Sequence, residues 1–368
     1  MLAKLKSHLK KFDWILFLSV LLLCFFGLIE IYSIALGQET LSFLNFKKQI
    51  FFIGAGVILM FVVSFIDIYF LKSLRKYFYL GAVLILIAVL VFGSTIRGTT
   101  GWFNVLGFGI QPVEIVKVIL LLVLAGYFSN LSTRVKSFGH LLSSGILAFG
   151  LAFLVILQPD FGSTFILLFV WFFLLLFSGF NKKYIIAVIL AGAIIFSSLW
   201  LVFFKDYQKQ RVLTFLNLNQ SSLEEGYNVS QAIIAVGSGG LTGRGVGFGS
   251  QSQLKFLPEA QNDFVFAVIS EELGFLGVSL LFLFFVVIFA RLLIRIGKLK
   301  DDFAIYFVLG ALGLIFIQMF INIGMNIGIF PVVGISLPFV SYGGSAILSS
   351  FILLGLLQNI IIQSKIKY

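Results

Sequence analysis

The sequence predicts an all-α, polytopic membrane protein with ten transmembrane helices and a long extracellular loop between helices 7 and 8. Of its 368 residues, 60% are hydrophobic and 11% are charged, and the mean hydropathy is +1.11. A soluble core does not need this much apolar surface. Runs of about 18 or more apolar residues recur without the period-2 alternation of a β-barrel, so helices are expected to span the bilayer. The predicted spans are residues 14–33, 48–66, 77–93, 113–129, 140–157, 161–180, 184–203, 264–290, 303–328 and 345–363.

The basic residues predict the orientation. With a cytoplasmic N-terminus, the segments on the inner side hold most of the 26 Lys and Arg residues, as the positive-inside rule requires. We therefore expect both termini in the cytoplasm. The net charge of +11 then indicates a basic inner face against anionic membrane lipids and argues against nucleic-acid binding. The only cysteine, Cys24, lies in a span, and His8 and His140 fall on the inner side. Acid–base chemistry at the outer face is thus expected to use carboxylates.

The chain is predicted to form one membrane domain, residues 1–368, whose outer segments are its least regular parts. The loop at about 204–262 is far longer than the usual connection between helices, which suggests that it has a function. Residues 329–344 contain Pro331, Pro338 and several glycines but no charge. This composition predicts a re-entrant or capping element that is buried in protein.

The fourth span opens on Gln111-Pro-Val-Glu114, with Lys117 three residues further on. Glu114 in the first turn is stabilised by the helix dipole, and Lys117 is placed to pair with it across one turn. Either the two residues form a buried structural ion pair, or they line a cavity for a lipid headgroup. Ionisable groups within a membrane are usually functional, which favours the second interpretation.

Asp160 lies in the short outer turn Gln158-Pro-Asp-Phe-Gly-Ser163 between the fifth and sixth spans. One interpretation is that it caps the next helix through backbone N–H groups. The other is that it contributes to a binding site, because Glu114 and Lys117 lie at the same outer end of the bundle. Both interpretations stay open at this point.

The long loop contains two segments with two interpretations each. The basic segment Asp206-Tyr-Gln-Lys-Gln-Arg211 is typical of an anchor at the lipid surface, but Arg211 is also suited to hold a phosphate with two hydrogen bonds. Residues 237–249 are rich in glycine and include Arg244. They match no nucleotide-binding pattern. Close packing, a lid or contact with phosphate would each explain these glycines.

The most informative segment is Leu257-Pro-Glu-Ala-Gln-Asn-Asp-Phe264, which is followed by Glu271-Glu272. Asp263 lies where the long loop enters the eighth span, so it is either the cap of that helix or a base. A carboxylate beside aromatic residues at a membrane surface is expected to have a raised pKa, as a general base requires. Glu271 and Glu272 cannot both face lipid, so at least one is expected to point into the protein.

These motifs resemble the SEDS family (shape, elongation, division and sporulation), which includes RodA, FtsW and SpoVE. The resemblance covers the whole chain and is strongest to RodA. It rests on the three strings above and on Gly334-Ile-Ser-Leu-Pro-Phe-Val-Ser-Tyr-Gly-Gly344. Four positions depart from the family pattern: Gln261-Asn262 stands for His-Thr, Gly101 for Arg and Val113 for Ser. These changes affect the surroundings of Asp263 and the contacts to phosphate, but they keep the carboxylate.

The resemblance implies a peptidoglycan glycosyltransferase of the bacterial cell (inner) membrane that polymerises lipid II and works with a class B penicillin-binding protein. Asp263 matches the essential aspartate of the family. An α-linked donor and a β-1,4 product require inversion, so one base suffices, and Asp263 is expected to deprotonate the acceptor. Lys117, Arg211 and Lys255 are candidates for balancing the pyrophosphate charge, with Glu114 and Asp160 as further substrate-binding residues. A divalent cation, Mg2+ or Mn2+, held by carboxylates stays open.

Three alternatives remain at this stage. A lipid II flippase would also place charges inside a ten-span bundle, but it should have polar groups at both membrane depths, whereas here they gather at the outer end. A scaffold without catalytic activity would recruit the penicillin-binding protein and would not need Asp263. A division polymerase of the FtsW type would share the chemistry and differ in its partner.

Overall fold

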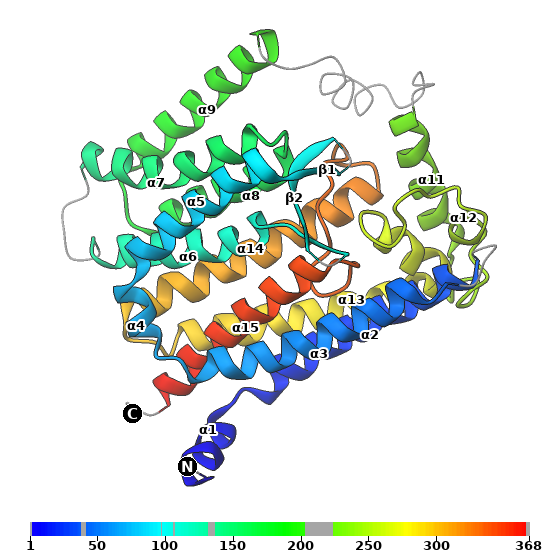
Figure 1. The fold of residues 1–368 in the computed structure, drawn as a ribbon, viewed down its shortest axis with the longest axis horizontal. Helices are drawn as coiled ribbons and strands as arrows, with labels where there is room; N and C mark the ends of the chain where they lie inside the picture. Colours follow the sequence, from blue (N-terminus) through cyan, green and yellow to red (C-terminus); the bar gives the residue numbers. More distant parts are fainter. Residues whose placement is uncertain are drawn as a thin grey trace.

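The computed structural model describes residues 2–37, 42–96, 98–105, 107–131, 137–202 and 224–365, and they form a bundle of long helices (Figure 1). A helix lies at each of the ten predicted ranges. Seven of the described helices are long and apolar enough to cross a membrane, α8 is a shorter apolar helix, and the number of crossings stays a prediction. The ten are α2 (Trp14–Leu36), α3 (Leu44–Phe65), α5 (Arg75–Phe92), α6 (Val113–Ser129), α7 (Phe138–Ile156), α8 (Phe161–Phe177), α9 (Lys182–Val202), α13 (Val265–Ile296), α14 (Asp302–Asn326) and α15 (Gly344–Ser364).

Shorter elements lie at the two ends of the bundle. α1 (Leu2–Lys11) and α4 (Ile68–Ser73) lie at the end where α15 finishes, and α11 (Glu224–Ser238) and α12 (Ser250–Gln253) lie at the other (Figure 1). A small antiparallel sheet of β1 (Ser94–Ile96), β2 (Thr99–Val105) and β3 (Phe108–Ile110) precedes α6, with strand order β1-β2-β3. This sheet was not predicted from the sequence. It connects α5 to α6, with β2 in contact with α5 and β3 in contact with α15.

Glycines let the innermost helices approach closely. α15 packs along α3, and a Cβ at Gly355 would lie 2.7 Å from the carbonyl oxygen of Met60. α2 packs along α13, and Gly27 of α2 lets the segment before α15 approach this helix, because a Cβ there would meet the carbonyl of Val340. In a membrane, where apolar surface gains little from leaving lipid, such close contact is a main source of helix association.

A buried ion cluster joins three helices at the end that carries both termini. Asp13 caps α2, and its carboxylate accepts hydrogen bonds from Arg291 and Arg295 of α13 at 2.7 and 2.6 Å. Gln358 of α15 pairs with its backbone, at 2.9 Å to the N–H and 3.0 Å to the carbonyl. Burial favours the neutral carboxyl, but the hydrogen bonds from both arginines hold the pKa of Asp13 below its ordinary value.

α13 is longer than the predicted span 264–290 and is broken at Gly274, which has φ 63° and ψ −162°. At the break, the backbone of the glycine-rich segment takes the place of the missing helical partners. Phe275 N donates to Gly240 O at 2.9 Å, and Arg244 N donates to Glu271 O at 3.0 Å. The break therefore separates a short first half, Val265 to Leu273, from the long second half.

Candidate active site

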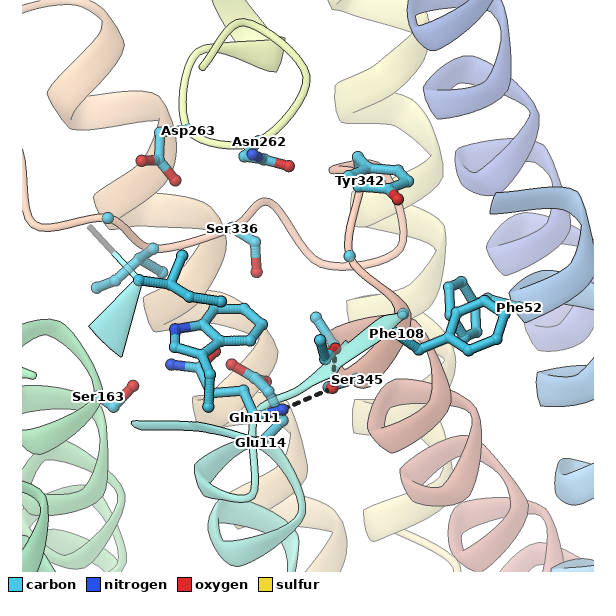
Figure 2. A pocket seen from close by; sticks show the side chains of 18 of the residues that line it. Phe52, Phe108, Gln111, Glu114, Ser163, Asn262, Asp263, Ser336, Tyr342 and Ser345 are labelled. Atoms are coloured by element: carbon cyan, nitrogen blue, oxygen red, sulfur yellow. Dashed lines mark hydrogen bonds between the residues drawn. The ribbon is translucent and has the colours of Figure 1, made fainter. Parts of the chain in front are cut away.

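A cavity of about 260 Å3 opens where the start of α6, the small sheet, residues 262–263 and the segment before α15 meet. Figure 2 shows Asp263 and Asn262 at one side of this cavity, with Ser336 between them and the lower group of Gln111 and Glu114. Its polar and aromatic lining includes Lys48, Trp102, Gln111, Glu114, Lys117, Ser163, Asn262, Asp263, Ser336, Tyr342 and Ser345. The predicted residues Glu114, Lys117 and Asp263 are thus brought together.

Glu114 and Lys117 form the predicted ion pair across the first turn of α6. The Nζ–Oε1 distance is 2.7 Å, and the side chains are 4% (Lys117) and 11% (Glu114) exposed. The pairing is confirmed, and because both residues line the cavity they are also available to a ligand. In such a buried place a charge is attracted to a counter-charge more strongly than in water.

Asp160 caps α8, as one of its two interpretations predicted. Its carboxylate accepts a hydrogen bond from Ser163 N at 2.9 Å and another from Gln111 Nε2 at 3.2 Å. Burial raises the pKa of the Asp160 carboxyl, opposed by the hydrogen bonds from Ser163 and by the charge of Lys117. Asp160 is not one of the described lining residues, but its partners Gln111 and Ser163 are. Its direct role in substrate binding stays a prediction.

The backbone of Asp263 is fixed by two buried asparagines of α14. Asn322 Nδ2 and Asn326 Nδ2 donate to the carbonyl oxygen of Asp263 at 3.1 and 2.9 Å. Across from its carboxylate lies Gly334, with φ +69°; a Cβ there would come within 3.8 Å of Asp263 Oδ2. The Asp263 side chain thus lines the cavity from a fixed backbone, and the residue opposite its carboxylate, Gly334, has no side chain.

The segment before α15 clamps the two residues that precede Asp263. Ser341 Oγ donates to Asn262 O at 2.6 Å, and Tyr342 N donates to Gln261 O at 2.8 Å. Both contacts use backbone oxygens of Gln261 and Asn262, which every residue type carries. The clamp is therefore independent of the side chains at these two positions, which depart from the family pattern.

Glu271 and Glu272 both point into the protein, so the prediction for at least one of them is confirmed. Glu271 accepts hydrogen bonds from the backbone of Gln251 and Ser252 at 2.9 and 3.2 Å. Glu272 accepts from Ser33 Oγ at 2.6 Å and from Gly247 N at 3.1 Å. Neither lines the cavity. The two carboxylates therefore fasten residues 247–253 to α13 and α2.

Close packing explains some of the glycines of residues 237–249, foremost Gly239 and Gly243, whose role the sequence left open. A Cβ at Gly239 would lie 1.8 Å from Ser270 O, and one at Gly243 would lie 2.1 Å from Glu272 O. Gly243 also has φ +78°, a conformation that disfavours side chains. The segment thus packs backbone to backbone against the first half of α13, and this contact holds the helix that begins beside Asp263.

Several residues of the site were not predicted. Trp102, Tyr342 and Ser345 line the cavity but were not predicted as site residues, although Trp102 is a lone Trp among Thr and Gly and Tyr342 lies in the family-like segment 334–344. Lys48 was not predicted as a site residue; its Nζ lies 5.4 Å from the Phe108 ring centroid and 3.4 Å from Gly107 O. Glu30 of α2, which is not part of the described cavity lining, is fully buried, and neither of its carboxylate oxygens has a hydrogen-bond partner among the described residues.

Two of the predicted site residues, Arg211 and Lys255, do not belong to the described cavity lining. Arg211 lies outside the described residues. Lys255 is exposed, has φ +60° and is not among the described lining residues of the cavity. Within the described ranges, no group of three or more His, Cys, Asp or Glu residues is arranged to hold a metal ion.

The fold and the site define a multi-pass helical membrane protein with a charged cavity between its helix ends. Residues 13–366 match the family model described as cell cycle protein, FtsW, RodA and SpoVE, and the chain belongs to this family. It is similar to peptidoglycan glycosyltransferase MrdB of Escherichia coli strain K12, with 35% identity over 85% of each chain. It is also similar to stage V sporulation protein E of Bacillus subtilis strain 168, with 34% identity over 95% of this chain and 96% of the relative.

Solved structures give the same family. A chain from a peptidoglycan synthase complex that coordinates polymerisation and crosslinking superposes with a TM-score of 0.80 and 26% identity, covering 97% of this chain and 98% of that one. The rod shape determining protein RodA of Thermus thermophilus gives a TM-score of 0.71 and 26% identity, covering 95% and 96%.

Proposed function

We propose that this protein is a peptidoglycan glycosyltransferase that polymerises lipid II into glycan strands with inversion, with Asp263 as the general base. The observation that carries the proposal is that Asp263, Glu114 and Lys117 line one cavity. The names of its relatives support the activity. Lipid II lies in the bilayer and carries its own pyrophosphate leaving group, so the donor needs no further activation.

The reaction is a single displacement. The 4-hydroxyl oxygen of the acceptor GlcNAc bonds to C1 of the donor sugar as the C1–O bond to the pyrophosphate breaks. The hydroxyl proton passes to the carboxylate of Asp263, and the bonding electrons leave with the pyrophosphate. A base within hydrogen-bond reach of the hydroxyl is the geometric requirement. The fixed backbone around Asp263 supports this role, because catalysis depends on preorganised groups.

Lys117 is the described cation best suited to the leaving group. Its ammonium lies inside the cavity, where a pyrophosphate would compete with Glu114 for it. Cations aimed at charge that develops in the transition state supply a large part of many rate accelerations. Glu114 holds the ammonium in place before the substrate arrives. Asp160, Arg211 and Lys255 stay proposed as further substrate contacts.

The same proposal includes the membrane topology, the localisation and the partner of the chain. We place ten spans in the bacterial inner membrane, with both termini in the cytoplasm and the cavity at the outer end. We further propose that the chain works in cell elongation with a class B penicillin-binding protein. The likeness to a chain from a synthase complex that couples polymerisation to crosslinking supports a partner of this kind.

The test is polymerisation of purified lipid II by the reconstituted protein with its class B partner. Asp263→Asn and Asp263→Ala should each lower the yield of glycan strands at least about 100-fold, the lower end of the range for loss of a general base. Glu259→Gln is the matched control, because this carboxylate lies in the same loop but does not line the cavity. Full activity of Asp263→Asn in a folded protein would contradict the base assignment. An inactive wild type that moves lipid II across vesicles would favour the flippase.

A further inference from the structure

We infer that the end of the bundle that carries both termini holds a binding site for the phosphate headgroup of an anionic lipid. A cleft of about 530 Å3 lies there between the last turns of α13 and α15. Four basic side chains line this cleft, those of Arg295, Lys298, Lys300 and Lys365. Among the described residues, no acidic side chain is part of this lining. The site is separate from the cavity that holds Asp263.

The positive charge of this cleft exceeds the negative charge near it. Asp13, the buried acid beside Arg295, is shared between Arg295 and Arg291. Asp301 and Asp302 both follow Lys300 in the chain, and the carboxylate of Asp301 also caps α14 through Ala304 N at 3.0 Å. The C-terminal ends of two helices contribute only about half a negative charge each. An anionic group would therefore complement the charge of the cleft.

Lys365 shows the effect of this crowding. Its ammonium donates to Lys11 O at 2.6 Å, which holds it at the cleft. Burial lowers the pKa of Lys365, and the charges of Arg295, Arg291 and Lys298 lower it further, against the opposite effect of Asp13. The neighbouring cations thus disfavour its charged form, and a bound phosphate would reverse this effect.

Apolar side chains beside the cleft favour a lipid over a free anion. Leu293 and Ile294, in the last turns of α13, are 56% and 49% exposed. They follow the buried Leu292 and precede the basic residues, so apolar surface and positive charge adjoin on one helix end. An amphiphile with an anionic head and acyl chains complements both features, whereas inorganic phosphate would use only the charge.

The test uses the full-length protein in neutral detergent micelles, with thermal unfolding as the readout. Phosphatidylglycerol should raise the unfolding temperature in a saturable way, because a ligand that binds the folded state stabilises it. Phosphatidylcholine with the same acyl chains and inorganic phosphate serve as the comparison probes. Each basic residue near an anionic lipid is worth about a fivefold change in affinity. Lys298→Gln with Lys365→Gln should therefore raise the half-saturating concentration about 25-fold.

Three matched variants separate loss of binding from loss of folding. Lys298→Arg with Lys365→Arg keeps the charge and should bind phosphatidylglycerol like the wild type. Lys182→Gln with Lys183→Gln removes two exposed charges at the start of α9 and should also leave binding unchanged. Lys298→Gln alone, at an exposed position, should give about a fivefold loss. Equal stabilisation by phosphatidylcholine, wild-type binding by the Gln variants, or an equal response to inorganic phosphate would each overturn the inference.

Discussion

Ser341 donates a hydrogen bond of 2.6 Å to the carbonyl oxygen of Asn262, the residue before Asp263. The same hydroxyl accepts a hydrogen bond from Leu337 N at 2.8 Å, so it joins the segment before α15 to the loop that carries the proposed base. Ser341 is buried. It does not line the cavity, so its contribution to activity is expected to pass through the position of Asp263.

Ser341→Ala should lower the turnover number of lipid II polymerisation by about tenfold, because a misplaced catalytic group reduces the fraction of productive complexes. The Michaelis constant should change little, since the substrate does not touch this hydroxyl. Steady-state kinetics on the reconstituted complex measures both constants. Ser349→Ala is the control, because the Ser349 hydroxyl only bonds within α15, to Ala346 O at 3.0 Å. A raised Michaelis constant at unchanged turnover would place Ser341 in substrate binding instead.

The Glu114–Lys117 pair allows its structural and functional roles to be separated. Glu114→Gln or Lys117→Gln leaves one buried charge without its partner and should destabilise the protein by about 3 kcal/mol. The double variant removes both charges and should recover most of that stability. Its polymerase activity should stay at least about 100-fold below the wild type, because the leaving group has lost its cation. Chemical unfolding and product yield are measured on the same preparations.

A double variant that regained full activity along with stability would contradict the proposed role of Lys117. The pair would then be the structural ion pair that the sequence also allowed. Lys48 is the control cation, since it lines the same cavity but is partly bonded to Gly107 O. If Lys48→Gln alone abolished activity while the double variant did not, the leaving group would be assigned to that side of the cavity.

Gly243→Ala should destabilise the protein strongly, and Gly240→Ala should not. Both glycines have positive φ, 78° and 55°. A Cβ at Gly243 would meet Glu272 O at 2.1 Å, whereas nothing lies within 4 Å of one at Gly240. Gly240→Ala should thus show only the backbone penalty of about 1 kcal/mol, and Gly243→Ala should exceed it by at least about 2 kcal/mol. Unfolding in denaturant measures both. Equal losses would show that the loop adjusts to the added methyl group.

The sequence predicted the helices better than their ends and their breaks. Apolar runs placed a helix at all ten ranges, because burial in lipid requires long apolar segments. The eighth span was predicted to end at 290, and the helix that contains it, α13, continues to Ile296. Arg291 and Arg295 extend it by pairing with Asp13, far away in the sequence. Gly274 gave no sign of the helix break, because the partners that complete it come from the loop at 240–245.

Part of the site could also be predicted from the sequence, because charged residues are rare in this chain. Glu114, Lys117 and Asp263 attracted attention because charge is rare in this chain, and all three line the cavity. Trp102 and Tyr342 reach it through the sheet and the segment before α15, whose placement depends on tertiary contacts. Lys255 was chosen for its charge alone and lies exposed outside the described lining. Rarity of charge therefore found Glu114, Lys117 and Asp263, but it gave no sign of the uncharged lining residues and it also selected the exposed Lys255.

Asp13→Asn should remove an acid-dependent part of the stability. The folded-state pKa of Asp13 lies below its ordinary value, so in acid the unfolded chain binds the proton more tightly than the folded protein. Its stabilising contribution is therefore fully present above the unfolded pKa of about 3.9, and it is lost as the pH falls through the lower folded value. At pH 7 the variant should be about 3 kcal/mol less stable, and the gap from the wild type should narrow in acid. Denaturant unfolding between pH 7 and acid measures the free energy of unfolding of both proteins.

Asp302→Asn, at an exposed carboxylate outside the cluster, is the control and should leave the free energy of unfolding close to that of the wild type. A gap that stayed constant down to low pH would mean that the arginines act on Asp13 through packing and not through its charge.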